Sequence, residues 1–153
     1  MRVKDREVPS LDGRQTLKMF GIFCIIPKDM KVVEMWPTTP YILGSMTPAY
    51  TWNNKIRVNP DLFLMVDIKI MIEECIHGFQ YRRMNHGWGF FPTYIWHVIL
   101  DMVNKRRRNG KSIHNANIME EEAMSGAKAI VESFQFTGEP LDIEKEIKKY
   151  FGW

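Results

Sequence analysis

The sequence predicts an α+β fold, with short strands in the first half of the chain and helices in the second. Residues 38–60, TTPYILGSMTPAYTWNNKIRVNP, are β-branched and rich in turn-forming residues, whereas apolar residues recur at helical spacing over 62–85. The chain has 153 residues, 45% hydrophobic and 25% charged. This length suits one hydrophobic core and this composition excludes extensive disorder, so we expect residues 1–153 to form one domain.

The N-terminal half is expected to open with a short helix over 10–27, SLDGRQTLKMFGIFCIIP. Ser10 or Asp12 would cap it and Pro27 would end it, although its apolar residues are dense enough for a strand instead. MKVVEMW, residues 30–36, is typical of a strand. Within 38–60 we expect short strands joined by turns, with NNK as a tight hairpin-like turn.

The C-terminal half is expected to contain three to four helices. The first covers 62–85, and the second covers 92–108, with a proline near its first turn and basic residues at its end. A third covers 116–134, and a short amphipathic helix closes the chain within 137–153. Strands followed by helices are the order of an α+β domain.

Charge, cysteines and hydropathy restrict the class of protein. The net charge is only +3, which allows weak attraction to anions without requiring nucleic acid. Two distant cysteines predict no disulfide framework. The polar N-terminus is not a signal peptide, and no apolar run approaches the roughly 20 residues that span a bilayer. We therefore expect a soluble protein, cytoplasmic or assembled into a particle, with no membrane partner.

The helix predicted over 62–85 carries the residues suited to chemistry. Its segment EECIH places Glu73 and His77 at i and i+4, on one helical face, with Glu74 about 100° to the side. Two such side chains can ligate a metal ion, and a neighbouring carboxylate can act as a general base on metal-bound water. A charged helix face with one histidine satisfied in the core would show the same spacing, so both readings stay open.

Three segments together resemble the zincin-like metallopeptidase domains, whose motif helix reads roughly HELxHVWQYRR. This chain has EECIHGFQYRR over 73–83. Upstream, NNKIRVNPDL over 53–62 is similar to the strand and turn of those proteins, and downstream NIMEEEA over 117–123 is similar to their NPxExEA motif. The resemblance covers about residues 30–127 and implies a zincin-like arrangement of strands and helices.

The resemblance also implies a ligand set and a role for each residue. Glu73, His77 and Glu120 would hold one divalent metal ion, zinc or manganese, and Glu74 would be the catalytic general base. Glu73 stands where the family has its first histidine. Two carboxylates and one imidazole are harder donors, which weakens the preference for zinc. Without a metal, the crowded carboxylates should raise one another's pKa values unless Arg82, Arg83 or another base neutralises them.

Two functions are consistent with Glu73 standing where the family has its first histidine. The one we favour is a catalytically degenerate zincin-like domain, a pseudoenzyme that binds one divalent metal ion, zinc or manganese, or none. It would bind a protein partner as a structural or interaction component of a larger assembly, such as a virus or phage particle. The alternative is a small metal-dependent peptidase that uses Glu73, His77 and Glu120 as ligands and Glu74 as the base. Loss of the first histidine motivates the former, and retention of the other motif residues motivates the latter.

Aromatic residues are the candidate partner-binding surface. Trp88, Phe90 and Phe91 lie in the loop segment HGWGFFP, and Trp153 ends the given sequence. Aromatic side chains of this kind line clefts and interfaces, but they also pack helices into a core. Trp153 in particular is expected either to fold against the body of the domain or to bind another subunit.

A basic run is the last candidate site. It comprises Lys105, Arg106, Arg107, Arg108 and Lys111. These side chains could contact the phosphates of a nucleic acid, which makes nucleic-acid binding a third possible function. The alternative is a basic helix C-terminus that complements the helix dipole, and no recognition motif for nucleic acid accompanies the run.

Overall fold

The computed structural model describes residues 16–19, 22–35, 48–52, 54–83, 99, 118–135 and 138–153. Five of the six described strands precede the helices and one short strand lies near the C-terminus, a mixture of helix and strand that agrees with the α+β class. The strands are β1 (Thr16–Met19), β2 (Ile22–Ile25), β3 (Lys31–Glu34), β4 (Ala49–Trp52), β5 (Lys55–Val58) and β6 (Leu141–Asp142). The helices are η2 (Pro60–Met65), a 3-10 helix, and α2 (Ile68–Arg83), α6 (Ile118–Ser133) and α7 (Ile143–Phe151).

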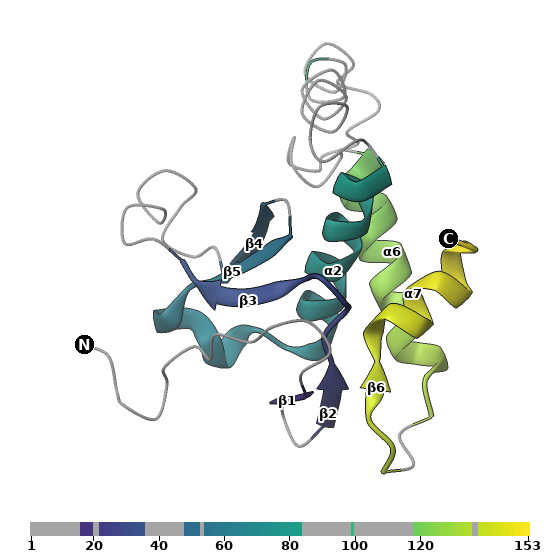
Figure 1. Ribbon diagram of the computed structural model, residues 1–153, viewed down its shortest axis with the longest axis horizontal. Helices are drawn as coiled ribbons and strands as arrows, with labels where there is room; N and C mark the ends of the chain where they lie inside the picture. The colour runs from purple at the N-terminus through teal and green to yellow at the C-terminus, as the bar shows by residue number, and fades with distance from the viewer. Residues whose placement is uncertain are drawn as a thin grey trace, which may run out of the picture.

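The strands form two small sheets (Figure 1). In one, β2 lies between antiparallel β1 and parallel β6. In the other, β5 lies between parallel β3 and antiparallel β4, with Thr51 opposite Ile56. The predicted strands within 30–36 and 38–60 are thus confirmed where the structure describes them. The parallel pairings join segments that are distant in sequence, and the sequence pattern did not indicate them.

The predicted helix over 10–27 is wrong for its described residues, which form the β1–β2 hairpin instead. Cys24 is fully buried while its neighbour Phe23 is 47% exposed, the alternation typical of a strand. Cys24 pairs with Leu17 on one side and with Leu141 on the other. The partner Leu141 is more than a hundred residues away, so a tertiary contact decides between the two conformations that the apolar composition allowed.

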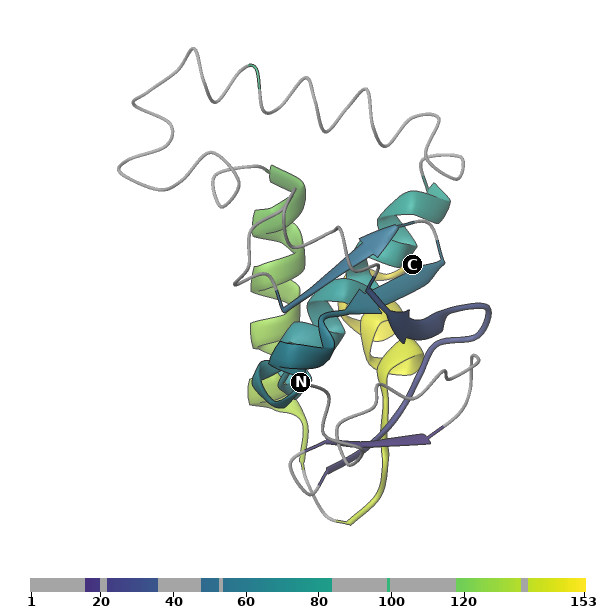
Figure 2. The same cartoon turned by 90° about the vertical axis from the view of Figure 1, so that its left-hand side faces the viewer.

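Helix α2 is the central element of the described structure. Asp67 caps it, because its Oδ1 accepts a hydrogen bond of 2.8 Å from the Ile70 amide and its carbonyl accepts one from Met71. The sheet β3-β5-β4 lies on one side of α2, and α6 and α7 lie on the other (Figures 1 and 2). Contact on both sides explains why apolar residues surround most of the helix, among them Ile68, Met71, Ile72 and Ile76.

The C-terminal residues close over α2 and α6. Asp142 caps α7 through a 3.3 Å hydrogen bond from the Lys145 amide, and Gly152 ends it in the left-handed conformation with φ of 72°. Buried Ile143 and Ile147 face the core, which confirms the amphipathic helix predicted there. The helix predicted over 92–108 falls almost wholly outside the described residues. Among the residues described, no helix combines the length and the apolar character needed to cross a membrane.

Candidate functional site: an acidic and histidine cluster between α2 and α6

The structure brings His77 and Glu120 into direct contact. His77 lies in the middle of α2, and Glu120 lies in the first turn of α6, 43 residues later. The His77 Nε2 atom is 3.1 Å from the Glu120 Oε2 atom, and the two side chains are only 11% and 13% exposed. Packing of α6 along α2 therefore brings His77 and Glu120 into direct contact. The sequence resemblance implied only that both residues would ligate the same metal ion.

Gln80 determines how the His77 ring is oriented. Its Nε2 atom donates to the Met119 carbonyl and to Glu122 Oε1, both at 3.0 Å. Its Oε1 atom consequently faces His77 Nδ1, at 2.8 Å. Gln80 is 3% exposed, so these bonds satisfy an amide that has almost no access to water. The ring of His77 thus has an acceptor on each side.

These two acceptors favour the doubly protonated imidazolium. Burial alone would lower the pKa of His77, but the hydrogen bond and negative charge of Glu120, with smaller contributions from Glu74 and Gln80, raise it to about 9. A ring with that pKa carries a proton on both nitrogens at neutral pH. His77 and Glu120 therefore form a largely buried ion pair.

Glu74 lies on the sheet side of α2 and is held by the edge of β4. The Thr51 hydroxyl is 2.6 Å from Glu74 Oε2 and 2.8 Å from the Glu74 carbonyl oxygen. Glu74 is 9% exposed, and burial raises its pKa, with small contributions in the same direction from Glu120 and Glu73. A carboxylate whose pKa is raised is a stronger base than an ordinary glutamate, which is a property of a general base.

Glu73 contacts Lys69, whereas the predicted ligand set requires it to share a metal ion with His77 and Glu120. Its Oε1 atom is 3.6 Å from Lys69 Nζ, one turn earlier on α2. Burial raises the pKa of Glu73, and Lys69 and His77 oppose this rise. The neutralising base is therefore Lys69. Arg82 instead donates to the Lys28 carbonyl at 2.6 Å.

The candidate ligand residues face different partners, because Glu73 faces Lys69 whereas His77 and Glu120 face each other. Within the described part of the chain, no three His, Cys, Asp or Glu side chains are grouped so that they could share one. A histidine ligand must be neutral with a free lone pair, and the contact of Nδ1 with the Gln80 oxygen leaves Nε2, which faces Glu120, as the nitrogen that could ligate a metal. A metal would have to displace the Nε2 proton and draw Glu73 away from Lys69.

Sequence reasoning missed three residues of this cluster. Gln80 lies three residues after His77, on the same helical face, and belongs to the FQYRR segment, so i, i+3 spacing could have indicated it. Glu122 lies two residues after Glu120, within the acidic NIMEEEA segment. Thr51 had no signal in the sequence, because its contact with Glu74 depends on how the sheet is placed against α2.

The remaining candidate residues lie elsewhere. Trp88, Phe90 and Phe91 are outside the described residues, as are Lys105, Arg106, Arg107, Arg108 and Lys111. Trp153 is described, and it folds back onto the domain. It stacks on Phe151 at 4.2 Å between ring centroids, and the Arg83 guanidinium lies 4.4 Å from the centre of its ring. Partner binding by Trp153 stays a prediction, and its side chain already has intramolecular contacts.

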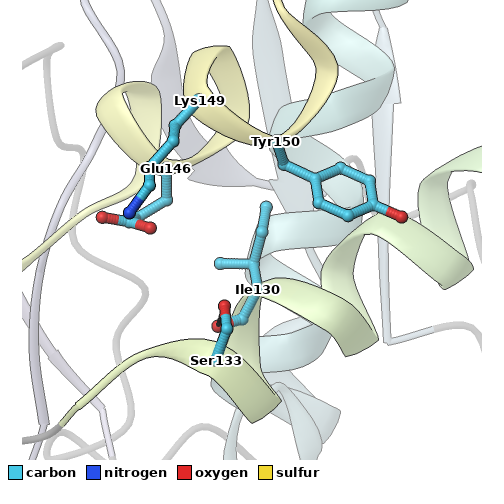
Figure 3. A pocket seen from close by; sticks show the side chains of 5 residues that line it. All are labelled: Ile130, Ser133, Glu146, Lys149 and Tyr150. Carbon is cyan, nitrogen blue, oxygen red and sulfur yellow. Dashed lines mark hydrogen bonds between the residues drawn. The ribbon is translucent and has the colours of Figure 1, made fainter.

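One hollow of about 280 Å³ lies away from the cluster, between the end of α6 and α7. Figure 3 shows its lining, with Ile130 and Ser133 on α6 facing Glu146, Lys149 and Tyr150 on α7. None of the predicted catalytic or ligand residues lines it. The hollow therefore contributes nothing to the chemistry considered for α2 and Glu120.

No protein-family model, no curated protein and no solved structure matches this chain.

Proposed function

We propose that this chain is a zincin-like domain that has lost metal-dependent catalysis and serves as a structural or interaction component of a larger assembly. One observation carries the proposal: the residues that would hold a metal are engaged by one another and by neighbouring side chains. His77 pairs with Glu120 and Gln80, Glu73 faces Lys69, and Glu74 pairs with Thr51. Buried polar groups that are satisfied internally need no ion.

Exposed aromatic side chains support an interaction role. Trp52, at the end of β4, is 55% exposed, and it follows Thr51, the residue that contacts Glu74. Phe23 on β2 is 47% exposed, and Tyr150 on α7 is 50% exposed. Large aromatic residues are enriched in the cores of protein interfaces relative to other surfaces. Because consecutive side chains of a strand point to opposite faces, a protein partner that covers Trp52 would bind the face of β4 opposite to the one that contacts Glu74.

A second candidate function has support from a separate observation. Glu74, with its raised pKa, lies close enough to His77 and Glu120 for their charges to influence it. That proximity would suit a metal-dependent peptidase in which Glu74 is the base. The two candidates differ in one measurable property, because only the peptidase requires the wild-type protein to retain a metal ion.

The decisive experiment restores the missing histidine. We would express wild type, Glu73→His and Glu132→His in medium supplemented with zinc and manganese, and measure bound metal by elemental mass spectrometry. Glu132→His is the matched control, because it adds a histidine on an exposed part of α6. We expect near-stoichiometric zinc in Glu73→His alone, since that change recreates the ligand set of two histidines and one carboxylate.

Other outcomes would contradict the proposal. Stoichiometric metal in the wild type, together with peptide hydrolysis that Glu74→Gln abolishes, would establish the peptidase instead. Absence of metal from Glu73→His, with the variant still folded, would mean that residues 73, 77 and 120 do not lie as they do in zincin-like proteins. For the interaction role, a Trp52→Ser variant should lose partner binding without losing thermal stability. Unchanged assembly would exclude Trp52 from the interface.

A further inference from the structure

The sheet β3-β5-β4 has two faces of different chemical character. Its inner face lies against α2 (Figure 1) and consists mostly of buried Val32, Ala49, Ile56 and Val58, together with Thr51. Because side chains alternate along a strand, the residues between these point to the other side of the sheet. We call that side the outer face, and its residues are Lys31, Val33, Tyr50, Trp52, Lys55 and Arg57.

The first row of the outer face places an aromatic ring beside two cations. The register pairs Lys55 with Trp52 of β4 on one side and with Lys31 of β3 on the other. Neighbouring strands lie about 5 Å apart, so the three residues are adjacent on the surface of the sheet. All three are exposed, Trp52 to 55%. An exposed indole therefore lies next to the side chains of two lysines.

The second row adds another aromatic ring. The register places Arg57 between Tyr50 and Val33, which are both partly buried. Arg57 is only 8% exposed, so contact with a ligand on this face is left mainly to the two aromatic residues and the two lysines. Tyr50 and Trp52 are two residues apart on β4, a separation of about 7 Å along the strand.

Lysines and aromatic rings on one sheet surface match the two parts of a nucleotide. Ammonium groups bind the phosphates of the backbone, and bases stack on aromatic side chains. The sheets of RNA-binding domains present aromatic residues to bases in the same way. A phosphate between Lys31 and Lys55 is attracted by both, and the net charge of +3 attracts polyanions to the protein as a whole.

A single-stranded nucleic acid fits the outer face better than an acidic protein or a duplex. The carboxylates of an acidic protein supply negative charge, but they supply no flat ring to cover Trp52. The bases of a duplex already stack on one another, whereas those of a single strand are free to stack on protein side chains.

We propose that the outer face binds single-stranded nucleic acid, with bases stacked on Trp52 and Tyr50 and with backbone phosphates bound by Lys31 and Lys55. This site uses no residue of the basic run over 105–111, and it lies on the opposite face of the sheet from Thr51, which contacts the cluster on α2. The inference rests on the proposed function only in treating the Trp52 side of the sheet as an interaction surface.

Stacking is tested with the full chain and a labelled oligothymidylate of about 15 nucleotides, whose binding is followed by fluorescence anisotropy. We expect Trp52→Ala to weaken binding on the order of tenfold, and Trp52→Phe to keep most of the affinity because its ring still offers a stacking face. Tyr150→Ala is the matched control, since it removes a side chain of similar exposure from α7, and it should leave the affinity unchanged. Thermal melts establish that each variant is folded.

Phosphate contacts are tested by repeating the titration over a range of salt concentrations. Each phosphate contact with a single strand contributes about 0.7 to the slope of log affinity against log salt, so Lys31→Gln and Lys55→Gln should each reduce the slope by about 0.7. Lys128→Gln removes the same charge from an exposed position on α6, where the side chain is 69% exposed, and should not change the slope. Equal effects of Lys128→Gln and Lys55→Gln would overturn the proposal, because net charge alone would then explain the binding.

Three other results would also overturn it. One is the absence of oligonucleotide binding, and another is equally tight binding of polyglutamate or of a duplex of the same length. The third is binding that Trp52→Ala leaves unchanged but that replacement of Arg106 and Arg107 by glutamine abolishes, since the basic run would then hold the nucleic acid.

Failure of this inference is distinguishable from failure of the proposed function. If the oligonucleotide does not bind while Trp52→Ser loses a protein partner, the inference is overturned and the proposed function stands. If the oligonucleotide binds as expected while the wild type holds stoichiometric metal and hydrolyses peptides, the proposed function is overturned and the inference stands.

Discussion

Raising the pH from 6.5 to 9 should destabilise the wild-type protein far more than the Glu120→Gln variant. The reason is the pKa of His77, which Glu120 helps to raise from 6.5 to about 9 in the folded protein despite the opposing effect of burial. In this pH range the folded protein keeps a proton on the ring that the unfolded chain has released. Stability from this group is therefore complete below pH 6.5 and is lost as the pH rises through 9.

The magnitude follows from proton linkage. One proton bound only by the folded state changes the free energy of unfolding by about 1.4 kcal/mol per pH unit. Over the interval from the ordinary pKa of 6.5 to the folded value of about 9, the loss comes to about 3 kcal/mol. In Glu120→Gln the main cause of the raised pKa is gone while the burial of the ring remains. The stability of this variant should therefore change much less over the same range.

Urea denaturation followed by tryptophan fluorescence, at half-unit steps between pH 6.5 and 9.5, measures the effect. The comparison with Glu120→Gln matters because burial also raises the pKa of Cys24 and Cys75, so their ionisation contributes to the slope in both proteins. Only the difference between the two slopes reports the ion pair. Parallel slopes, or a wild-type stability that stays flat up to pH 9, would refute the assignment of His77 and Glu120 as a buried ion pair.

Three further predictions test local features. Asp29 has φ of 65° in the turn between β2 and β3, so Asp29→Gly should stabilise the protein by about 0.5 kcal/mol and Asp29→Val should destabilise it by about 1–2 kcal/mol in thermal melts. A Cβ atom at Gly126 would lie 2.5 Å from the Phe151 ring, so Gly126→Ala should cost about 1–2 kcal/mol despite the better helix propensity of alanine, and Phe151→Leu should relieve most of that cost. Burial raises the pKa of Cys24 to about 11 and that of Cys75 well above its usual range, so neither thiol should react with Ellman's reagent at pH 8 until the protein is denatured, and rapid labelling of the native protein would contradict their burial.

Local patterns in the sequence were sufficient to predict most of the described elements. The helical spacing over 62–85 and 116–134 corresponds to α2 and α6, and the β-branched stretch before them corresponds to β4 and β5. The spacing of apolar residues predicts these elements because each buries one face along its whole length, so that apolar residues recur with the period of the helix or strand. Spacing also identified Glu73, Glu74 and His77 as neighbours on α2, since positions on a helix are related by its geometry alone.

Long-range contacts decided the rest. Apolar composition allowed either a helix or strands at 16–25, and pairing of β2 with β6, from the other end of the chain, selected the strands. The partners of the site residues were likewise undetermined by spacing, because Thr51 and Glu120 approach α2 only when the sheet and α6 pack on opposite sides of it. The sequence alone thus determined which side chains share a helix. Only the tertiary structure decided that His77 meets Glu120 directly, because that contact joins two helices 43 residues apart in sequence, whereas the contact of Glu73 with Lys69 is an i, i+4 pair that helix geometry alone allows.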